Sequence, residues 1–292
     1  MWLWLALLTL LYLLLSAYVL YRMFILLRAV IYTSTFMMED TILDPSGVFV
    51  LPLLSDPRKD VSYRCLLLIL DMYNTNFGME TRFRFQDQIL QYEFVHKKEI
   101  IGRVYRSDQN EDTMWIVFRG TITWYDVLKD TQRVQVFLDN GIGIHDGFYE
   151  LFTSVIMEPL GEILRKHPEI RNVLCTGHSL GAALAAVIIS HFSSRFPSLR
   201  WLGFLYGCPR IGNDAFVRTL DRPSIRMYSI KNSCDMIPNT PLAVTVNFVR
   251  YDQPYLYTDI EPILTFTDNR RSWEFNHAIY TYLRNAYSVR LS

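Results

Sequence analysis

The chain has 292 residues, of which 50% are hydrophobic, and its 29 basic and 29 acidic side chains give a formal net charge of zero. This length and apolar content predict one large core with an appendage. Because the charges are interspersed along the chain, no basic face is expected to follow a phosphate backbone, and nucleic acid is excluded as a predicted partner.

The amino-terminal segment is the predicted appendage. Residues 2–21 contain no charged side chain, and a helix of this length is about 30 Å long, which matches the hydrocarbon core of a bilayer. A cleaved signal peptide is the alternative, but nothing basic precedes Trp2 and bulky residues continue beyond the run. We therefore expect residues 1–31 to form a retained membrane anchor with one transmembrane helix.

The orientation of this anchor follows from its flanking charges. Arg22 and Arg28 lie only on the carboxyl side of the apolar run, and basic flanks tend to stay in the cytosol. A single-pass membrane protein with a cytosolic catalytic domain is the expectation. The four cysteines lie in or beside apolar segments, which suits buried free thiols better than a disulfide framework. They are Cys65, Cys175, Cys208 and Cys234.

The rest of the chain alternates between predicted helices and strands. Residues 32–60 are rich in turn-forming residues and are expected to be a tether and entry segment, followed by a catalytic domain over residues 61–292. Apolar spacing predicts helices at 61–73, 154–166 and 180–196, and strands at 91–96, 100–106, 113–118, 172–176, 202–206 and 225–230. This alternation indicates an α/β fold with a mostly parallel central sheet flanked by helices.

Gly177-His178-Ser179-Leu180-Gly181 is a G-x-S-x-G sequence between a predicted buried strand and a strongly helix-forming, alanine-rich segment. A sharp strand-to-helix turn lifts the serine hydroxyl above the sheet, and the flanking glycines remove side chains that would collide. The helix amino terminus faces the negative charge that develops during acyl transfer. Ser179 is therefore the predicted nucleophile, and an ordinary tight turn is the alternative.

The base and the acid are predicted by elimination. Folds with a G-x-S-x-G nucleophile turn place the three catalytic residues in the chain order Ser, Asp, His. Of the six histidines, only His191 and His277 follow Ser179. His191 lies twelve residues along the same predicted helix, about 18 Å away, so His277 is the predicted base.

Asp235 is the predicted acid, because it follows a predicted strand through a turn and so reaches the carboxyl edge of the sheet. Asp214 comes too early in the chain, and Asp252 and Asp259 are the reserve candidates. A turn-capping role for Asp235 is the alternative interpretation.

Several ordered segments around these residues resemble the class 3 lipases, the family of fungal triacylglycerol lipases and eukaryotic diacylglycerol lipases. They are F-R-G-T at 118–121, D-V-L-K-D at 126–130, H-D-G-F at 145–148, the nucleophile segment at 177–184, G-C-P-R-I-G-N at 207–213, D-M-I-P at 235–238 and N-H at 276–277. The resemblance covers residues 113–282 and implies an α/β-hydrolase fold. Two positions depart from the family pattern: Val127 replaces the usual Trp and Thr131 the usual Leu.

The resemblance also implies roles for residues that spacing alone does not assign. The backbone N–H of Leu180, together with the backbone and hydroxyl of Thr121, would form the oxyanion hole. Residues 122–129 would form a short lid or its hinge, with an apolar face for lipid; the alternative is that these side chains belong to the core. The lid side chains are Trp124, Tyr125, Val127 and Leu128.

The predicted activity is hydrolysis of glycerolipid acyl esters, such as tri-, di- and monoacylglycerols, by Ser179, Asp235 and His277 through an acyl-enzyme. The membrane, through residues 2–21, and an acylglycerol substrate are the predicted partners. No metal or organic cofactor is expected, because candidate ligands do not cluster at zinc spacing and no phosphate-binding glycine loop is present. The alternatives are a phospholipase or galactolipase with the same triad, and a catalytically inactive hydrolase fold that serves as a lipid-binding module.

Overall fold

The computed structural model describes residues 57–76, 88–107, 111–120, 134–245 and 254–286, together with residues 16, 18 and 20. The chain divides into two compact units, Met1–Val50 and Leu51–Ser292, and every element below lies in the second. Apart from residues 16, 18 and 20, the predicted anchor lies outside the described residues, and so does most of the tether. Among the helices within the described ranges, none combines the length and the hydropathy that a membrane crossing requires.

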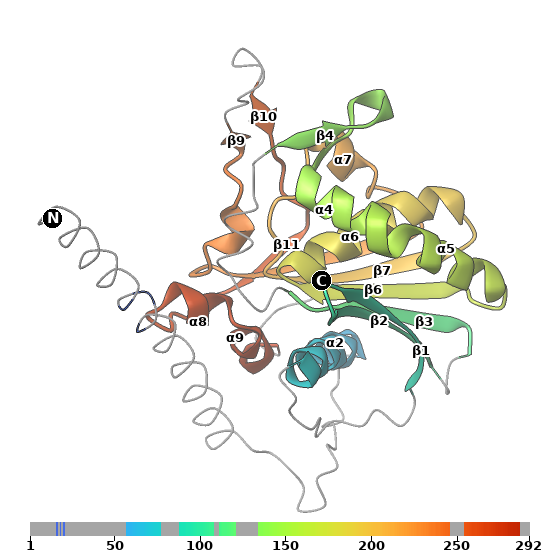
Figure 1. Ribbon diagram of the computed structural model, residues 1–292, viewed down its shortest axis with the longest axis horizontal. Coiled ribbons are helices and arrows are strands. Elements are labelled where there is room, and N and C mark those ends of the chain that lie inside the picture. The colour runs from blue at the N-terminus through green and yellow to red at the C-terminus, as the bar shows by residue number, and fades with distance from the viewer. Residues whose placement is uncertain are drawn as a thin grey trace, which may run out of the picture. The chain divides into compact units, whose positions relative to one another are not determined.

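A seven-stranded sheet carries the described part of the fold, with the strand order β1-β2-β3-β6-β7-β8-β11 (Figure 1). Strands β1 to β3 pair antiparallel at one edge, and β3, β6, β7, β8 and β11 pair parallel. The strands are β1 Gln88–His96, β2 Glu99–Ser107, β3 Thr113–Phe118, β6 Asn172–His178, β7 Arg200–Tyr206, β8 Ile225–Asn232 and β11 Ile263–Phe266.

Two small antiparallel sheets lie apart from the main sheet. One pairs β4 Gln135–Phe137 with β5 Gly143–His145, and the other pairs β9 Val244–Thr245 with β10 Tyr255–Leu256. Short connecting helices are η1 Asp139–Gly141, α7 Asp214–Arg218, η3 Ile237–Asn239 and α8 Trp273–His277.

Helices cover the two faces of the main sheet (Figure 1). Buried hydrophobic side chains form one cluster on each face. The first cluster contains side chains of α4 Asp146–Leu151, the π-helical η2 Phe152–Ile156, α5 Met157–Lys166 and α6 Leu180–Arg195. The cluster on the other face contains side chains of α2 Pro57–Asn76 and α9 Ile279–Arg284. The side chains of β3 alternate between the two clusters, because successive residues of a strand point to opposite faces. The continuous apolar run of β3 is therefore explained by burial on both sides.

Most predicted elements are present, and their ends differ for identifiable reasons. The strand at residues 113–118 has the predicted bounds. The first predicted helix continues to Asn76, whose side-chain amide donates to the Met72 carbonyl at 2.8 Å and whose Oδ1 accepts from the Ile100 N–H at 3.1 Å. The helix predicted at 154–166 is helical from Asp146 onward. Strand β11 has only four residues, too few for a periodic pattern.

Candidate active site

Ser179 lies between the end of β6 and the start of α6 and has φ +58° and ψ −124°. A residue other than glycine rarely adopts positive φ, and such a conformation costs about 1–3 kcal/mol. The turn is tight because Gly177 lies against the backbone of Gly181: a Cβ on Gly177 would approach the Gly181 carbonyl carbon to 2.2 Å. The glycines of the G-x-S-x-G sequence are thus required by backbone packing, and the strain falls on the serine.

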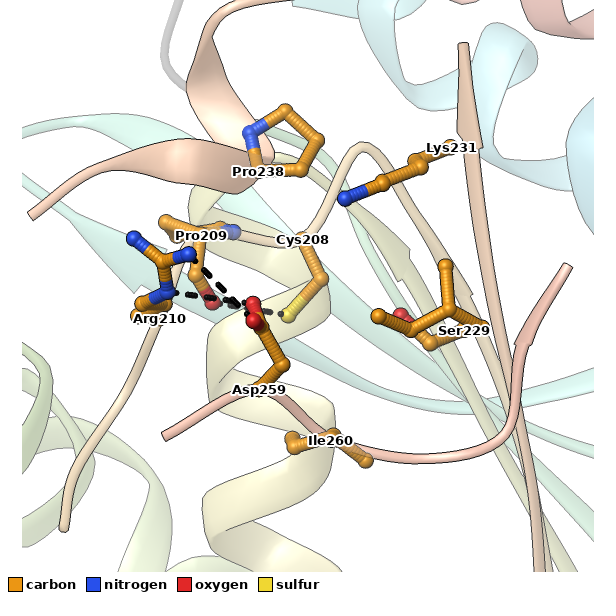
Figure 2. Close-up of a pocket in the computed structure, with 9 residues that line it drawn as sticks. Cys208, Pro209, Arg210, Ser229, Lys231, Pro238, Asp259 and Ile260 are labelled. Carbon is orange, nitrogen blue, oxygen red and sulfur yellow. Dashed lines mark hydrogen bonds and ion pairs between the residues drawn. The ribbon is translucent and has the colours of Figure 1, made fainter. Parts of the chain in front are cut away.

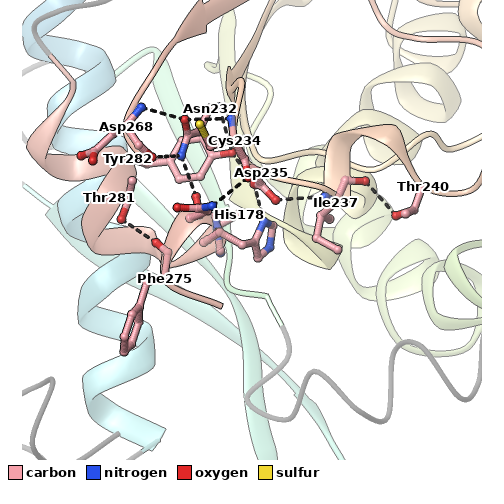
Figure 3. A network of polar contacts seen from close by, with 12 residues as sticks. His178, Asn232, Cys234, Asp235, Ile237, Thr240, Asp268, Phe275, Thr281 and Tyr282 are labelled. Atoms are coloured by element: carbon pink, nitrogen blue, oxygen red, sulfur yellow. Dashed lines mark hydrogen bonds and ion pairs between the residues drawn. The ribbon is translucent and has the colours of Figure 1, made fainter. Parts of the chain in front are cut away.

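Asp235 and His277 form a buried pair, each with 2% of its surface exposed. Asp235 Oδ2 lies 2.5 Å from His277 Nδ1. It also accepts a hydrogen bond from the Tyr282 hydroxyl at 2.6 Å (Figure 3). Asp235 Oδ1 accepts from the Ile237 N–H at 2.9 Å. Because an ionised carboxylate can only accept, His277 Nδ1 carries a proton toward it. With Nδ1 bonded to Asp235, Nε2 is the nitrogen of the His277 ring that can take a proton from a nucleophile.

Two contacts bring this pair to the nucleophile turn. His178, which precedes Ser179, lies with its ring centroid 4.5 Å from that of His277, and its Nε2 is 2.8 Å from the His277 backbone oxygen. Gly207 follows β7, and a Cβ there would lie 2.9 Å from His277 Cε1 and 3.2 Å from Asp235 Oδ2. The acid–base pair thus lies against the residue that precedes Ser179, at the carboxyl edge of parallel strands, where sites in such sheets form.

Tyr282 is a member of this site that the sequence reasoning missed. Burial, followed by the nearby Asp235, raises the pKa of its hydroxyl well above the usual range, so Tyr282 stays protonated and can donate to Asp235. Its position five residues after the predicted base is the only signal in the sequence.

The other candidates for acid and base have different partners. Asp259 forms a double ion pair with Arg210, with Nε–Oδ1 at 3.1 Å and Nη2–Oδ2 at 3.3 Å. This pair lines a small pocket together with Cys208 and Lys231, and the pocket contains none of the three predicted catalytic residues (Figure 2). His191 lies on α6 as predicted. Asp214 pairs with Arg218 on α7, and Asp252 lies outside the described residues.

Of the two predicted oxyanion residues, the structure describes Leu180 but not Thr121. Leu180 is the first residue of α6, so its N–H belongs to the helix amino terminus. The predicted oxyanion and lid residues between 121 and 128 lie outside the described residues; these are Thr121, Trp124, Tyr125, Val127 and Leu128. Gly120, immediately before them, is described: a Cβ on Gly120 would lie 2.9 Å from Ser179 Cβ. The strand end that leads to Thr121 therefore lies against the nucleophile.

Arg119 holds this strand end in place. The sequence pattern did not predict this role. Its side chain is buried and donates to the carbonyls of Ile100 at 2.8 Å and Gly120 at 2.6 Å, and pairs with Glu99 Oε2 at 2.6 Å. A planar guanidinium with several fixed donors suits this task better than a single ammonium would.

His145 and the cysteines take no part in the acid–base pair. The His145 ring is buried and stacks on Phe148 at 4.5 Å, and burial lowers its pKa from about 6.5 to about 4. All four cysteines are free, as predicted.

Large apolar side chains are exposed along the chain that follows Asp235. Met236, Leu242 and Val244 are 62%, 63% and 62% exposed. Val244 pairs across β9 and β10 with Leu256, which is 54% exposed, and Phe137 of β4 stacks on the neighbouring Tyr255. We call these five exposed residues the apolar rim; they are Phe137, Met236, Leu242, Val244 and Leu256.

The sheet order, the strained serine between β6 and α6, and the acid–base pair on later segments define an α/β-hydrolase fold. The model of the family described as lipase (class 3) matches residues 115–245, which supports the resemblance of this part of the chain to the class 3 lipases. It is similar to a phospholipase A(1) of Arabidopsis thaliana, with 32% identity over 51% of this chain and 37% of the relative, and to a lipase of Rhizomucor miehei, with 31% identity over 52% and 44%.

A secreted mono- and diacylglycerol lipase of Fusarium solani is 27% identical over 58% of this chain and 51% of its own length. The alignments thus span about half or less of these relatives. The crystal structure of the Rhizomucor miehei triacylglyceride lipase superimposes with a TM-score of 0.57 at 22% identity, over 75% of this chain and 83% of that chain. These likenesses support the fold described above.

Proposed function

We propose that the chain is a serine carboxylic ester hydrolase that cleaves acyl esters of glycerolipids. The observation that carries the proposal is the buried contact of Asp235 with His277 at 2.5 Å, beside a serine held at positive φ on a strand-to-helix turn. Nucleophile, base and orienting acid are the parts that acyl transfer through a serine needs.

In the proposed mechanism, His277 Nε2 takes the proton of the Ser179 hydroxyl while Oγ attacks the ester carbonyl carbon. The tetrahedral oxyanion is stabilised by the N–H of Leu180 and by Thr121. When the carbon–oxygen bond to glycerol breaks, His277 returns the proton to the leaving oxygen and an acyl-enzyme remains. Water repeats the sequence, releasing the fatty acid and restoring Ser179.

The apolar rim supports a lipid substrate. Met236 is the neighbour of the proposed acid Asp235, and the segment 236–245 carries no charged residue. An exposed apolar surface beside a site is typical of contact with an apolar phase. The relatives from Rhizomucor miehei and Fusarium solani are named as lipases, and we propose an acylglycerol as the substrate of this chain.

Phospholipid is the second candidate substrate, because the relative from Arabidopsis thaliana is named as a phospholipase A(1). The proposed catalytic set acts on the acyl ester and not on the head group. We therefore propose to compare hydrolysis of mono-, di- and triacylglycerols with that of phospholipids, using the full-length chain.

Membrane attachment through residues 2–21 is also part of the proposal. It is supported by a run of 20 residues without a charge and by basic residues on the carboxyl side alone. A tethered hydrolase would meet its lipid at the high local concentration of a bilayer. Protease protection in microsomes tests the orientation; a protected catalytic domain would contradict a cytosolic location.

Ser179→Ala is the direct test of the activity. We expect it to abolish hydrolysis of lipid esters and labelling by a fluorophosphonate probe, because the nucleophilic oxygen is gone. Ser154→Ala is the matched control, since Ser154 is an exposed serine whose hydroxyl bonds only the Glu150 carbonyl on its own helix. Undiminished activity in Ser179→Ala would falsify the assignment.

A further inference from the structure

The hydroxyl of Tyr73, near the end of α2, lies between the strand end and the nucleophile turn. It is 2.8 Å from the Gly120 backbone nitrogen and 3.0 Å from His178 Nδ1. The other ring nitrogen of His178 is 2.8 Å from the backbone oxygen of His277. A continuous chain of hydrogen bonds thus runs from the peptide before Thr121 to the backbone of the proposed base.

The direction of each hydrogen bond in this chain is determined. The His277 carbonyl can only accept, so His178 Nε2 carries the proton and donates to it. Burial, followed by the nearby His277, lowers the pKa of His178 well below its usual range, so the ring is neutral and Nδ1 is an acceptor. The Gly120 N–H can only donate to the Tyr73 oxygen, which leaves the Tyr73 proton for His178 Nδ1.

This chain of hydrogen bonds is complete, because each donor in it has one acceptor. Burial raises the pKa of the Tyr73 hydroxyl above its usual range, so the tyrosine keeps the proton that it donates. A fully paired and largely buried network fixes the positions of its members, whereas loss of one member leaves the others without a partner in surroundings of low polarity.

Gly120 is held on both sides of its backbone. Its N–H donates to Tyr73 at 2.8 Å and its carbonyl accepts from Arg119 at 2.6 Å. That carbonyl belongs to the peptide bond with Thr121, and in a planar trans peptide the direction of the carbonyl sets the direction of the next N–H. The contacts on Gly120 therefore fix the end of the strand from which the chain continues to Thr121, the proposed oxyanion residue.

We propose that Tyr73 is a positioning residue of the active site, which orients the oxyanion donor through Gly120 and the backbone of the base through His178. The proposal rests on the proposed function of Thr121 and His277. Tyr73 touches no reacting atom, and its effect is expected in the transition state, where the alignment of base and oxyanion donor matters most.

Tyr73→Phe is the test, because it removes one oxygen and leaves the ring. With a short soluble ester such as p-nitrophenyl butyrate, we expect kcat to fall about 10- to 100-fold, less than the 10²–10³-fold cost of removing an oxyanion donor itself. KM should change less than about twofold, because the substrate contacts remain.

Ser62→Ala is the matched control on the same helix. The Ser62 hydroxyl is buried and lies 2.8 Å from the Tyr206 hydroxyl, so its loss also breaks a buried hydrogen bond of α2 but touches neither Gly120 nor His178. We expect Ser62→Ala to lower Tm and keep the wild-type kcat. A wild-type kcat in a folded Tyr73→Phe variant would overturn the proposal.

Histidine signals in an NMR spectrum of the ¹⁵N-labelled full-length protein give a readout that does not depend on turnover. We expect His178 to be the neutral Nε2–H tautomer, and Tyr73→Phe to shift the signals of both His178 and His277. Unchanged His277 signals would refute the link to the base. If the wild-type chain hydrolyses no ester, the proposed function fails, and these signals still decide the role of Tyr73.

A second variant covers the case in which Tyr73→Phe does not fold. His178→Asn breaks the same chain of hydrogen bonds at its other end, and we expect the same loss of kcat at nearly constant KM. A wild-type kcat in this variant would also overturn the proposal.

Discussion

The strained backbone of Ser179 leads to a prediction that separates stability from activity. With φ +58° and ψ −124°, the Cβ of any L-residue crowds its own backbone, at a cost of about 1–3 kcal/mol. Ser179→Gly removes that Cβ, whereas Ser179→Ala keeps it. The entropy that glycine adds to the unfolded chain offsets about 0.5–1 kcal/mol of the gain.

With the midpoints of both ranges, the free energy of unfolding of Ser179→Gly should exceed that of Ser179→Ala by about 1.3 kcal/mol. At about 2–4 °C per kcal/mol for a domain of this size, the glycine variant should melt about 3–5 °C higher. Thermal unfolding followed by circular dichroism at one scan rate measures the difference. Both variants lack the hydroxyl and should be inactive, so turnover of substrate does not contribute to the difference in Tm. An equal or lower Tm for Ser179→Gly would refute the inference that the nucleophile turn is strained.

Three further predictions concern the turn, the pH dependence of stability and the apolar rim. Gly181→Ala should prevent folding, because its Cβ would lie 2.5 Å from a backbone oxygen, whereas Gly147→Ala, with contacts at 3.6 Å or more, should express as soluble protein. His145 binds a proton near pH 6.5 when unfolded and only near pH 4 when folded, so the folded state should lose about 3 kcal/mol as pH falls between these values. His145→Phe should reduce this loss in urea unfolding at pH 7.5 and 5; an unchanged loss would contradict the assignment. Leu242→Asp and Val244→Asp should lower hydrolysis of emulsified lipid and spare a soluble ester; equal effects on both substrates would contradict the role of the rim.

Much of the fold could be predicted from the sequence because its signals are local. The strand at residues 113–118 is apolar throughout since both of its faces are buried, and such a run is visible without any tertiary information. The G-x-S-x-G segment is equally local, because its glycines are required within one turn. The short strands β4, β9 and β10 have two or three residues each and carry no periodic signal.

The site was predictable in part. Chain order and elimination selected Asp235 and His277, and the structure brings these two side chains together; their catalytic roles, with that of Ser179, stay predictions until the variants are measured. Thr121 and the proposed lid lie outside the described residues, so the manner in which lipid enters is still an expectation from family resemblance.

Local sequence was sufficient for the turn that presents Ser179, because strand, glycines and helix follow one another within a few residues. The surroundings of that serine depend on packing between distant segments. Tyr73 meets His178 across 105 positions, and Tyr282 meets Asp235 across 47, and neither tyrosine differs in its local pattern from a core residue. Only the closing of α2 and α9 onto one face of the sheet brings their hydroxyls to the site, since hydrogen bonds act over about 3 Å in space and have no fixed spacing along the chain.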